Sequence, residues 1–137
     1  MNLSFQEKSL WLVFLSLLAF FGFYFARALP GAGRDVLPGQ VALFVGATVA
    51  LVVAQVVGHL VIAIMDRRTD ADERDGRIAL KGIRNGAYVL ATGVFLALCA
   101  GLVTEGNFVF THVLLGMWVL AQLVQTGSQL WLYRRGA

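Results

Sequence analysis

The chain has 137 residues, of which 58% are hydrophobic and only 14% are charged, and its net charge is +3. Soluble domains carry about a quarter charged residues, so this composition indicates a membrane protein without a separate soluble domain. The single cysteine, Cys99, excludes an internal disulfide and a CxxC redox or metal motif. It falls in an apolar stretch, where we expect a small buried side chain.

Four apolar stretches are long enough to cross a bilayer, because about 18 apolar residues suffice for a transmembrane helix. They are Ser9–Leu29, Val41–Met65, Gly86–Val103 and Phe108–Tyr133. The first is too long for the core of a signal peptide and ends in aromatic residues, so we expect a retained helix. The sequence therefore predicts an all-α, integral membrane four-helix bundle that forms one domain, 1–137.

The positive charges lie mostly on one side of these spans. Nine of the 11 Lys and Arg residues fall before the first span, between the second and third, or after the fourth, and only Arg27 and Arg34 fall on the other side. Cytoplasmic loops are enriched in Lys and Arg. We therefore expect both termini and the central loop in the cytoplasm, and the net positive charge requires no nucleic acid as a direct partner.

The two halves of the chain share a pattern. Residues 54–68 and 121–135 both begin with Ala-Gln and end with Arg-Arg, 67 positions apart, and Gly39 matches Gly106 at the same offset. One explanation is a duplication of a helical hairpin, with repeats 1–68 and 69–137 related by an axis along the membrane normal. The other is chance, since apolar helices align easily.

Polar side chains near the centre of the spans form the first candidate site. Gln55 lies 11 residues before Asp66, or about 16 Å along a helix, which is near the middle of a bilayer core about 30 Å thick. The repeat places Gln122 at the same depth, and His59 and Gln125 lie one turn further on. These groups either join helices by hydrogen bonds or form a midplane site for a solute or proton.

A bis-histidine metal or haem site is not expected. His112 lies near the outer end of the fourth span, whereas the repeat matches His59 with Thr126, 14 residues later. Two axial ligands need similar depths, so we predict neither a metal nor another cofactor.

Small residues recur at every fourth position in the second and third spans. Such ridges let transmembrane helices approach closely, either within the bundle or between two copies, and we predict a homodimer. Polar residues also form stripes that we expect to face the bundle interior. On the third span the stripe comprises Asn85, Tyr88, Thr92 and Cys99, and on the fourth Thr111, Gln122, Gln125, Thr126 and Gln129.

The central loop, residues 66–84, holds six basic and five acidic residues. Asp70-x-x-Glu73 fits a capping box, so the third helix should begin near Ala71. One hypothesis is a solvated loop that sets the topology. The sharper hypothesis is a docking site for a soluble protein, formed by Asp70, Asp72, Glu73, Arg74, Asp75 and Arg77. Beyond it, Arg77, Lys81 and Arg84 form a basic stripe expected to contact lipid headgroups.

Residues 72–98 also resemble a group of uncharacterised prokaryotic small membrane proteins. The resemblance is carried by Asp72, Glu73, Arg74, Asp75, Ile78, Gly82 and Arg84, where an Asp-Glu-Arg-Asp cluster, Ile and Gly-x-Arg lead into a membrane helix. It implies a gene neighbourhood with small helix-turn-helix regulators, which would suit a docking role, and it brings no catalytic residues.

Marks of catalysis are missing from the sequence, which has no nucleophile–base pair and no phosphate-binding loop. We therefore predict a non-catalytic sensor or docking partner in the cell membrane that acts through residues 66–84. The alternative is a minimal transporter or channel that uses Gln55, His59, Gln122 and Gln125.

Overall fold

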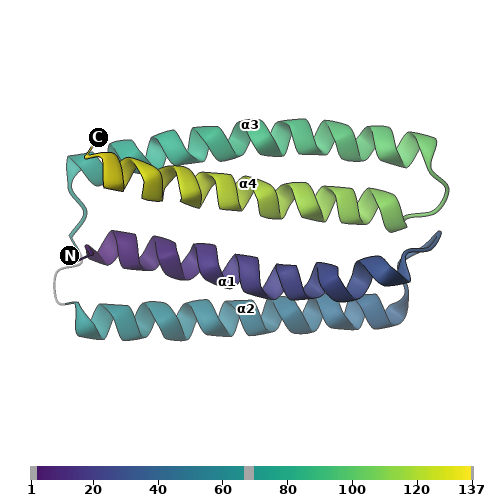
Figure 1. Ribbon diagram of the computed structural model, residues 1–137, viewed down its shortest axis with the longest axis horizontal. Helices are drawn as coiled ribbons and strands as arrows, with labels where there is room; N and C mark the ends of the chain where they lie inside the picture. Colours follow the sequence, from purple (N-terminus) through teal and green to yellow (C-terminus); the bar gives the residue numbers. More distant parts are fainter. Residues whose placement is uncertain (1–2, 67–69, 137) are drawn as a thin grey trace.

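The structure, a computed structural model, describes residues 3–66 and 70–136 and confirms an all-α four-helix bundle. The helices are α1 (Phe5–Ala28), α2 (Pro38–Met65), α3 (Glu73–Val103) and α4 (Phe108–Arg135), and a short 3-10 turn, η1 (Leu29–Gly31), follows α1 (Figure 1). Each helix is long and apolar enough to cross a membrane. Arg67 and Arg68, which belong to the predicted repeat and to the charge count, lie outside the described residues.

Local sequence explains where the helices begin and end. Ser4 caps α1 through a box with Glu7, in which each side chain accepts a hydrogen bond from the other residue's backbone N–H. Pro38 begins α2, because the first position of a helix needs no N–H donor. Gly136 ends α4 in the left-handed conformation that glycine adopts most easily.

The cap of α3 corrects one prediction. The N-cap is Asp72, not Asp70, and its box partner is Asp75: the Asp72 carboxylate accepts from the Asp75 backbone N–H at 2.8 Å. Asp72 and Asp75 have the same spacing as Asp70 and Glu73, with an acidic residue three positions after an Asp. The helix therefore begins at Glu73, two residues later than expected.

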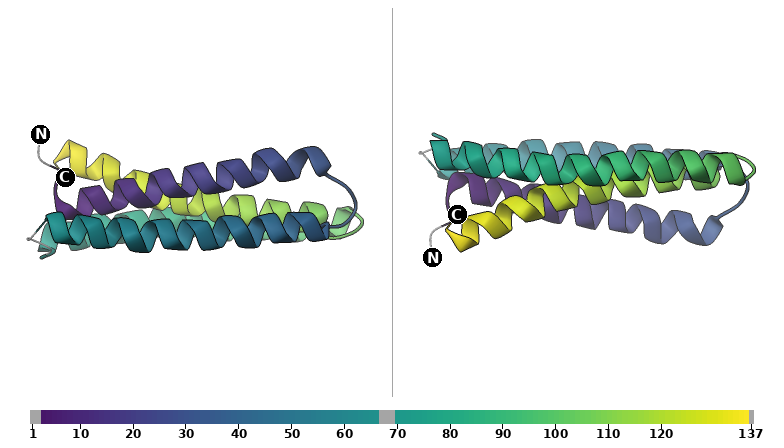
Figure 2. Two further views of the ribbon diagram at one scale, coloured as in Figure 1. Left: turned by 90° about the horizontal axis from the view of Figure 1, so that it is seen from below. Right: turned by 90° about the horizontal axis from the view of Figure 1, so that it is seen from above.

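The helices lie in the order α2, α1, α4, α3 (Figure 1). The main interfaces join α1 to α2, α1 to α4 and α3 to α4, and α2 and α3 have no comparable interface among the described residues. Figure 2 shows α1 and α4 crossing on one side of the molecule, with α2 and α3 flanking them on the other. The two hairpins therefore meet along α1 and α4, and the bundle is open between α2 and α3.

Close packing of α3 on α4 depends on glycine. Gly82, Gly86 and Gly93 are buried on α3. A Cβ at Gly86 would lie 2.9 Å from the Gln125 Cβ, and one at Gly93 would clash with the Met117 side chain. The small residues of the third span thus serve packing within the chain. The ridge of α2 is divided, because Gly58 packs on Leu12 of α1 whereas Gly46 faces open space.

Most large apolar side chains on α2 and α3 are exposed. In the described part of α2, only Gln40, Ala47 and Leu51 are buried. Because a monomeric soluble protein rarely exposes large apolar patches, this surface is suited to contact with lipid.

The polar stripe of the third helix faces α4 only at Asn85, which donates to the Ser128 hydroxyl at 3.1 Å. Tyr88 is 69% exposed, and Thr92 and Cys99 are also exposed. Thr92 donates its hydroxyl hydrogen to the Tyr88 carbonyl of its own helix at 3.0 Å. Such a bond satisfies the hydroxyl without an interhelical partner. The predictions of an inward-facing Tyr88 and Thr92 and of a buried Cys99 are therefore wrong, whereas Asn85 of the same stripe lies at the interface with α4.

The loops at the end opposite the two termini bind each other. Phe108 N–H donates to the Arg34 carbonyl at 3.1 Å, and Val36 N–H donates to the Asn107 side-chain oxygen at 2.8 Å. Gly106 has a positive φ of 77° and lies so close to the Arg34 carbonyl that a Cβ would clash with it. These bonds join the two hairpins outside their helical interface.

Gly93→Ala should destabilise the bundle by about 1–3 kcal/mol, because the new Cβ overpacks the contact with Met117. Unfolding of the detergent-solubilised protein, followed by circular dichroism, measures the effect. Gly22→Ala is the matched control, since its Cβ meets nothing within 4 Å. Equal stability of the two variants would contradict the close α3–α4 packing.

Candidate functional site

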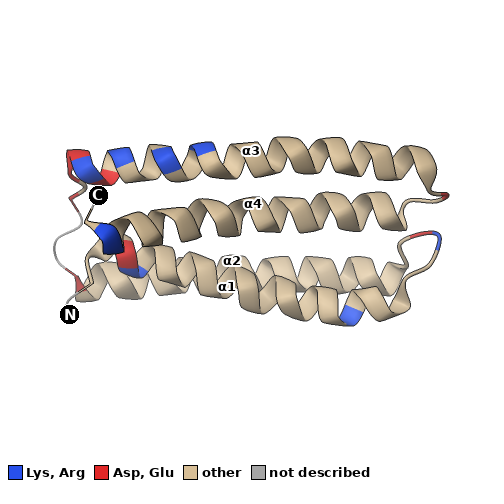
Figure 3. Ribbon diagram, turned by 45° about the horizontal axis from the view of Figure 1, so that its top comes forward, with Lys and Arg blue, Asp and Glu red and all other residues tan. Residues whose placement is uncertain are grey.

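Most charged residues lie at the end of the bundle that holds both termini and the α2–α3 link, which we call the charged end (Figure 3). Lys8 of α1 forms an ion pair with Asp66, which follows α2, at 2.8 Å. On the other hairpin, the Tyr133 hydroxyl of α4 donates to the Asp75 carboxylate of α3 at 2.5 Å. Each hairpin is therefore held at this end by a polar contact to a carboxylate.

Arg74 strengthens the second contact. Its guanidinium donates to the Tyr133 carbonyl at 3.3 Å and lies 5.9 Å from the centre of the Tyr133 ring. The carbonyl is among the last of α4, where intrahelical donors are missing, so a cation is favourable there. The first turn of α3 is thereby attached to the last turn of α4.

A hollow of about 400 Å³ lies between these helix ends, and we call it the acidic hollow. Its carboxylates come from the first turn of α1, the α2–α3 link and the first turn of α3: Glu7, Asp66, Asp70, Asp72 and Asp75. Arg74 and Tyr133 also line it. Among the described residues, no three acidic, His or Cys side chains come together in a group that could hold a metal ion. The carboxylates instead present a dispersed negative surface.

The structure divides the predicted docking residues into two sets. Asp70, Asp72, Arg74 and Asp75 line the acidic hollow, whereas Glu73 and Arg77 are exposed and do not line it. The predicted docking residues did not include Glu7 and Tyr133, which come from α1 and α4, or Asp66, which follows α2 and belongs to the predicted 66–84 segment. Glu7 carried a local signal, since Ser4-x-x-Glu7 places it in the first turn of a helix, and Asp66 lay within the charged segment 66–84.

The predicted midplane residues do not form one site. Gln55 donates to the Ser16 hydroxyl of α1 at 3.3 Å, and the His59 Nδ1–H donates to the Gln55 carbonyl at 2.7 Å. Gln125 packs beside Gly86 of α3. Gln122 accepts at its carbonyl from Thr126 at 2.8 Å. Within the described part of the chain, no hydrogen bond joins the α2 pair to the α4 pair, so these residues lie at different helix interfaces.

A buried polar pair that the sequence reasoning missed joins the hairpins. The Tyr24 hydroxyl of α1 lies 2.9 Å from His112 Nε2 of α4, while His112 Nδ1 lies 2.9 Å from the Phe108 carbonyl. Because a carbonyl can only accept, Nδ1 carries the hydrogen and Nε2 accepts from Tyr24. His112 therefore acts here as a structural link between α1 and α4.

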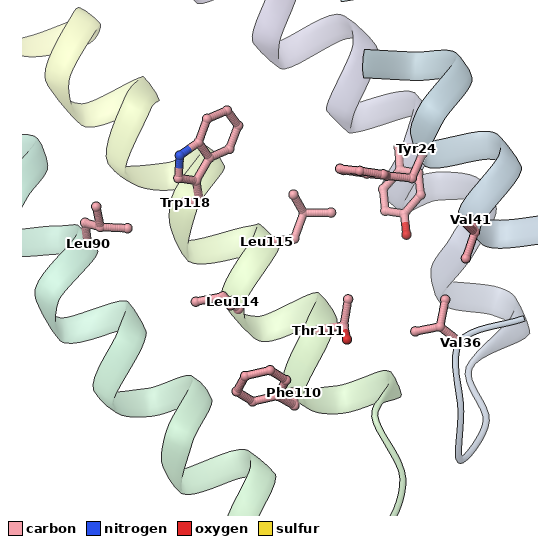
Figure 4. Close-up of a pocket in the computed structure, with 10 residues that line it drawn as sticks. Tyr24, Val36, Val41, Leu90, Phe110, Thr111, Leu114, Leu115 and Trp118 are labelled. Atoms are coloured by element: carbon pink, nitrogen blue, oxygen red, sulfur yellow. The ribbon is translucent and has the colours of Figure 1, made fainter. Parts of the chain in front are cut away.

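Beside this pair, an apolar hollow of about 490 Å³ opens between α2 and α3 (Figure 4). Tyr24, Thr111, Leu115 and Trp118 line it from α1 and α4, together with Val41 of α2 and Leu90 of α3. Its size falls in the range of small-molecule sites, about 300–1,000 Å³. Its wall offers few polar groups to orient a ligand, which suits an apolar occupant such as a lipid chain.

Comparison of the chain with protein families, curated proteins and solved structures finds no match. The resemblance of residues 72–98 to small prokaryotic membrane proteins therefore stays a prediction.

Tyr24→Phe should destabilise the protein by about 0.6–2 kcal/mol, because it removes an interhelical hydrogen bond and leaves His112 Nε2 without its donor. Thermal unfolding in detergent measures the change. Tyr88→Phe removes an exposed hydroxyl from α3 and should have no effect. The link between the hairpins would be refuted by a Tyr24→Phe variant as stable as Tyr88→Phe.

Proposed function

We propose that this protein is a non-catalytic membrane docking protein or sensor that binds a soluble cytoplasmic partner at its charged end. The observation that carries the proposal is the acidic hollow, which the first turns of α1 and α3, the link after α2 and the last turn of α4 form together. A partner seated there would contact both hairpins.

The placement of charge supports a cytoplasmic location for this end. Both termini lie there, which agrees with an even number of membrane crossings (Figure 1). Most Lys and Arg residues lie there too, as expected for the cytoplasmic side. We propose the cell membrane as the site of action, since its cytoplasmic face gives a soluble partner direct access.

The charge of the hollow favours a partner with a basic segment. Among the described residues, five carboxylates line it, against two cations: Arg74, which also lines it, and Lys8, which pairs with Asp66. Complementary charge accelerates encounter and selects the partner. A small transcription regulator would fit, because proteins that bind the DNA backbone carry Lys- and Arg-rich surfaces. This partner is also the one implied by the resemblance of residues 72–98.

The hollow could also report the state of the bundle. Glu7 and Asp66 belong to the first hairpin, whereas Asp72, Asp75 and Tyr133 belong to the second. A change in how α1 packs on α4 would alter the spacing of these groups and therefore the affinity for the partner. The transporter alternative stays a prediction, and the separation of Gln55 from Gln125 lends it no support.

A photo-crosslinking experiment tests the docking proposal. A photoreactive amino acid at Gln6, which lines the acidic hollow, should give an adduct with a soluble protein in intact cells. Placed at exposed Gly33, at the opposite end, the same probe should not. Asp70→Lys should reduce the Gln6 adduct by at least fivefold, because charge reversal repels a basic segment.

Glu105→Lys is the matched control, since it reverses one exposed carboxylate at the opposite end. It should leave the Gln6 adduct unchanged. An adduct insensitive to Asp70→Lys, or the absence of any soluble adduct, would overturn the proposal.

We also propose that two copies associate through α1 and α2. A hollow of about 430 Å³ runs between these helices on the outer surface, lined by Ala19, Phe20, Phe23, Ala42, Gly46 and Ala50. Exposed small residues at every fourth position permit close approach of another helix, which drives association in lipid. A second copy offers the same complementary ridge of small residues and aromatic rings.

Gly46→Leu should weaken this dimer without disturbing the fold, because a Cβ there meets nothing within 4 Å in the single chain. Energy transfer between labelled copies in liposomes, measured over a dilution series in lipid, gives the dissociation constant. Val52→Phe adds bulk to another exposed position of α2 and should leave association unchanged. Equal effects of both variants, or no transfer at all, would count against the dimer.

A further inference from the structure

Another hollow, of about 530 Å³, lies between α3 and α4, and we call it the basic hollow. Its lining combines two cations, an amide, a hydroxyl and an indole: Lys81, Arg84, Asn85, Ser128, Trp131 and Leu132. This combination has the donors that bind a phosphate group, beside an apolar surface. We propose that the basic hollow binds the phosphate of one anionic phospholipid as a defined site.

A hydrogen bond between two polar residues of the lining holds them in place. Asn85 of α3 donates its amide hydrogen to the Ser128 hydroxyl of α4 at 3.1 Å. Because Ser128 accepts this bond, its own hydrogen is left to donate to another acceptor. The bond is set where Gly82 and Gly86 let α3 and α4 approach closely. A bound phosphate oxygen would therefore meet donors on two helices whose spacing is fixed.

The charge around the basic hollow is of one sign. Lys81 and Arg84 form no ion pair with any described residue, and the sequence contains no Asp or Glu between Asp75 and Glu105 or within α4. The Arg135 guanidinium stacks on the Trp131 ring at 4.1 Å and adds a third cation at the rim. In Figure 3 the basic positions follow one another along this half of α3. Nothing in the lining opposes an anion.

The depth of the basic hollow matches the headgroup region. Arg84 lies 19 residues before Val103, the last residue of α3, or about 28 Å along the helix. This nearly equals the thickness of the hydrocarbon core, about 30 Å. The presence of Trp131 in the lining agrees with a position in the headgroup region, since tryptophan is enriched at membrane interfaces. Basic pockets between transmembrane helices at this depth are typical binding sites for anionic headgroups.

The surface next to the basic hollow can accept the lipid's chains. Towards the opposite end, Tyr88 and Phe95 follow Lys81 and Arg84 on the same face of α3, and both rings are more than 60% exposed. An acyl chain that leaves the headgroup would lie along these rings. A soluble phosphate lacks this contact, which is why we assign the site to a phospholipid. The proposal does not depend on the docking function.

Native mass spectrometry of the protein released from nanodiscs of phosphatidylglycerol and phosphatidylcholine tests the site. We expect one retained phosphatidylglycerol per chain. Lys81→Gln with Arg84→Gln should lower its affinity about 30-fold, since each basic side chain near an anionic surface contributes about fivefold. Lys81→Arg with Arg84→Lys keeps the charge and should retain most of the binding.

Two controls separate a built site from general attraction. Arg27→Gln with Arg34→Gln removes two exposed cations at the opposite end and should leave retention unchanged. Ser128→Ala keeps every charge and should lower the affinity severalfold. Equal losses in the two neutralised double variants, or full retention by Ser128→Ala, would overturn the proposal. So would inorganic phosphate that displaces the lipid at millimolar concentration, because the site would then recognise phosphate alone.

Discussion

The contact of α1 with α4 is the constraint on which the rest of the structure depends. It is the main helical interface between the two hairpins in the described residues, and the Tyr24–His112 pair lies buried within it. The loop bonds from Arg34 and Asn107 fix the same two hairpins at one end. Since lipid provides no hydrophobic incentive for helices to associate, these polar contacts and close packing set how the hairpins are placed. The shape of the acidic hollow depends on that placement, because residues of both hairpins line it.

Sequence was sufficient for the features that follow from hydropathy and charge. Four spans and a charged segment between the second and third could be predicted because a bilayer demands long apolar helices and excludes charge. Helix pairing could not be predicted, since a glutamine such as Gln55 or Gln125 can face any neighbour at the right depth. The outward direction of Tyr88 and Cys99 depended on that pairing as well, because the face of α3 that is buried is the one carrying Gly86 and Gly93.

The candidate site likewise contains some residues that could be predicted from the sequence and others that could not. The N-cap at Asp72 lies two residues after the predicted Asp70, and the docking residues of α3 could be named from their charge. Glu7 and Tyr133 could not, because they reach the acidic hollow from α1 and α4. The basic hollow was equally hidden: Lys81 and Arg84 form a visible stripe, but Ser128 and Trp131 join them only through the close approach of α3 and α4.

The sparse burial of α2 has a consequence for how the molecule comes apart. Along its 28 residues only Gln40, Ala47 and Leu51 are buried, whereas α3 packs closely on α4 at Gly82, Gly86 and Gly93. We therefore expect the separation of α2 from α1 to cost much less free energy than the separation of α3 from α4. Amide exchange would begin in α2, and the pair of C-terminal helices would persist as the last cooperative unit.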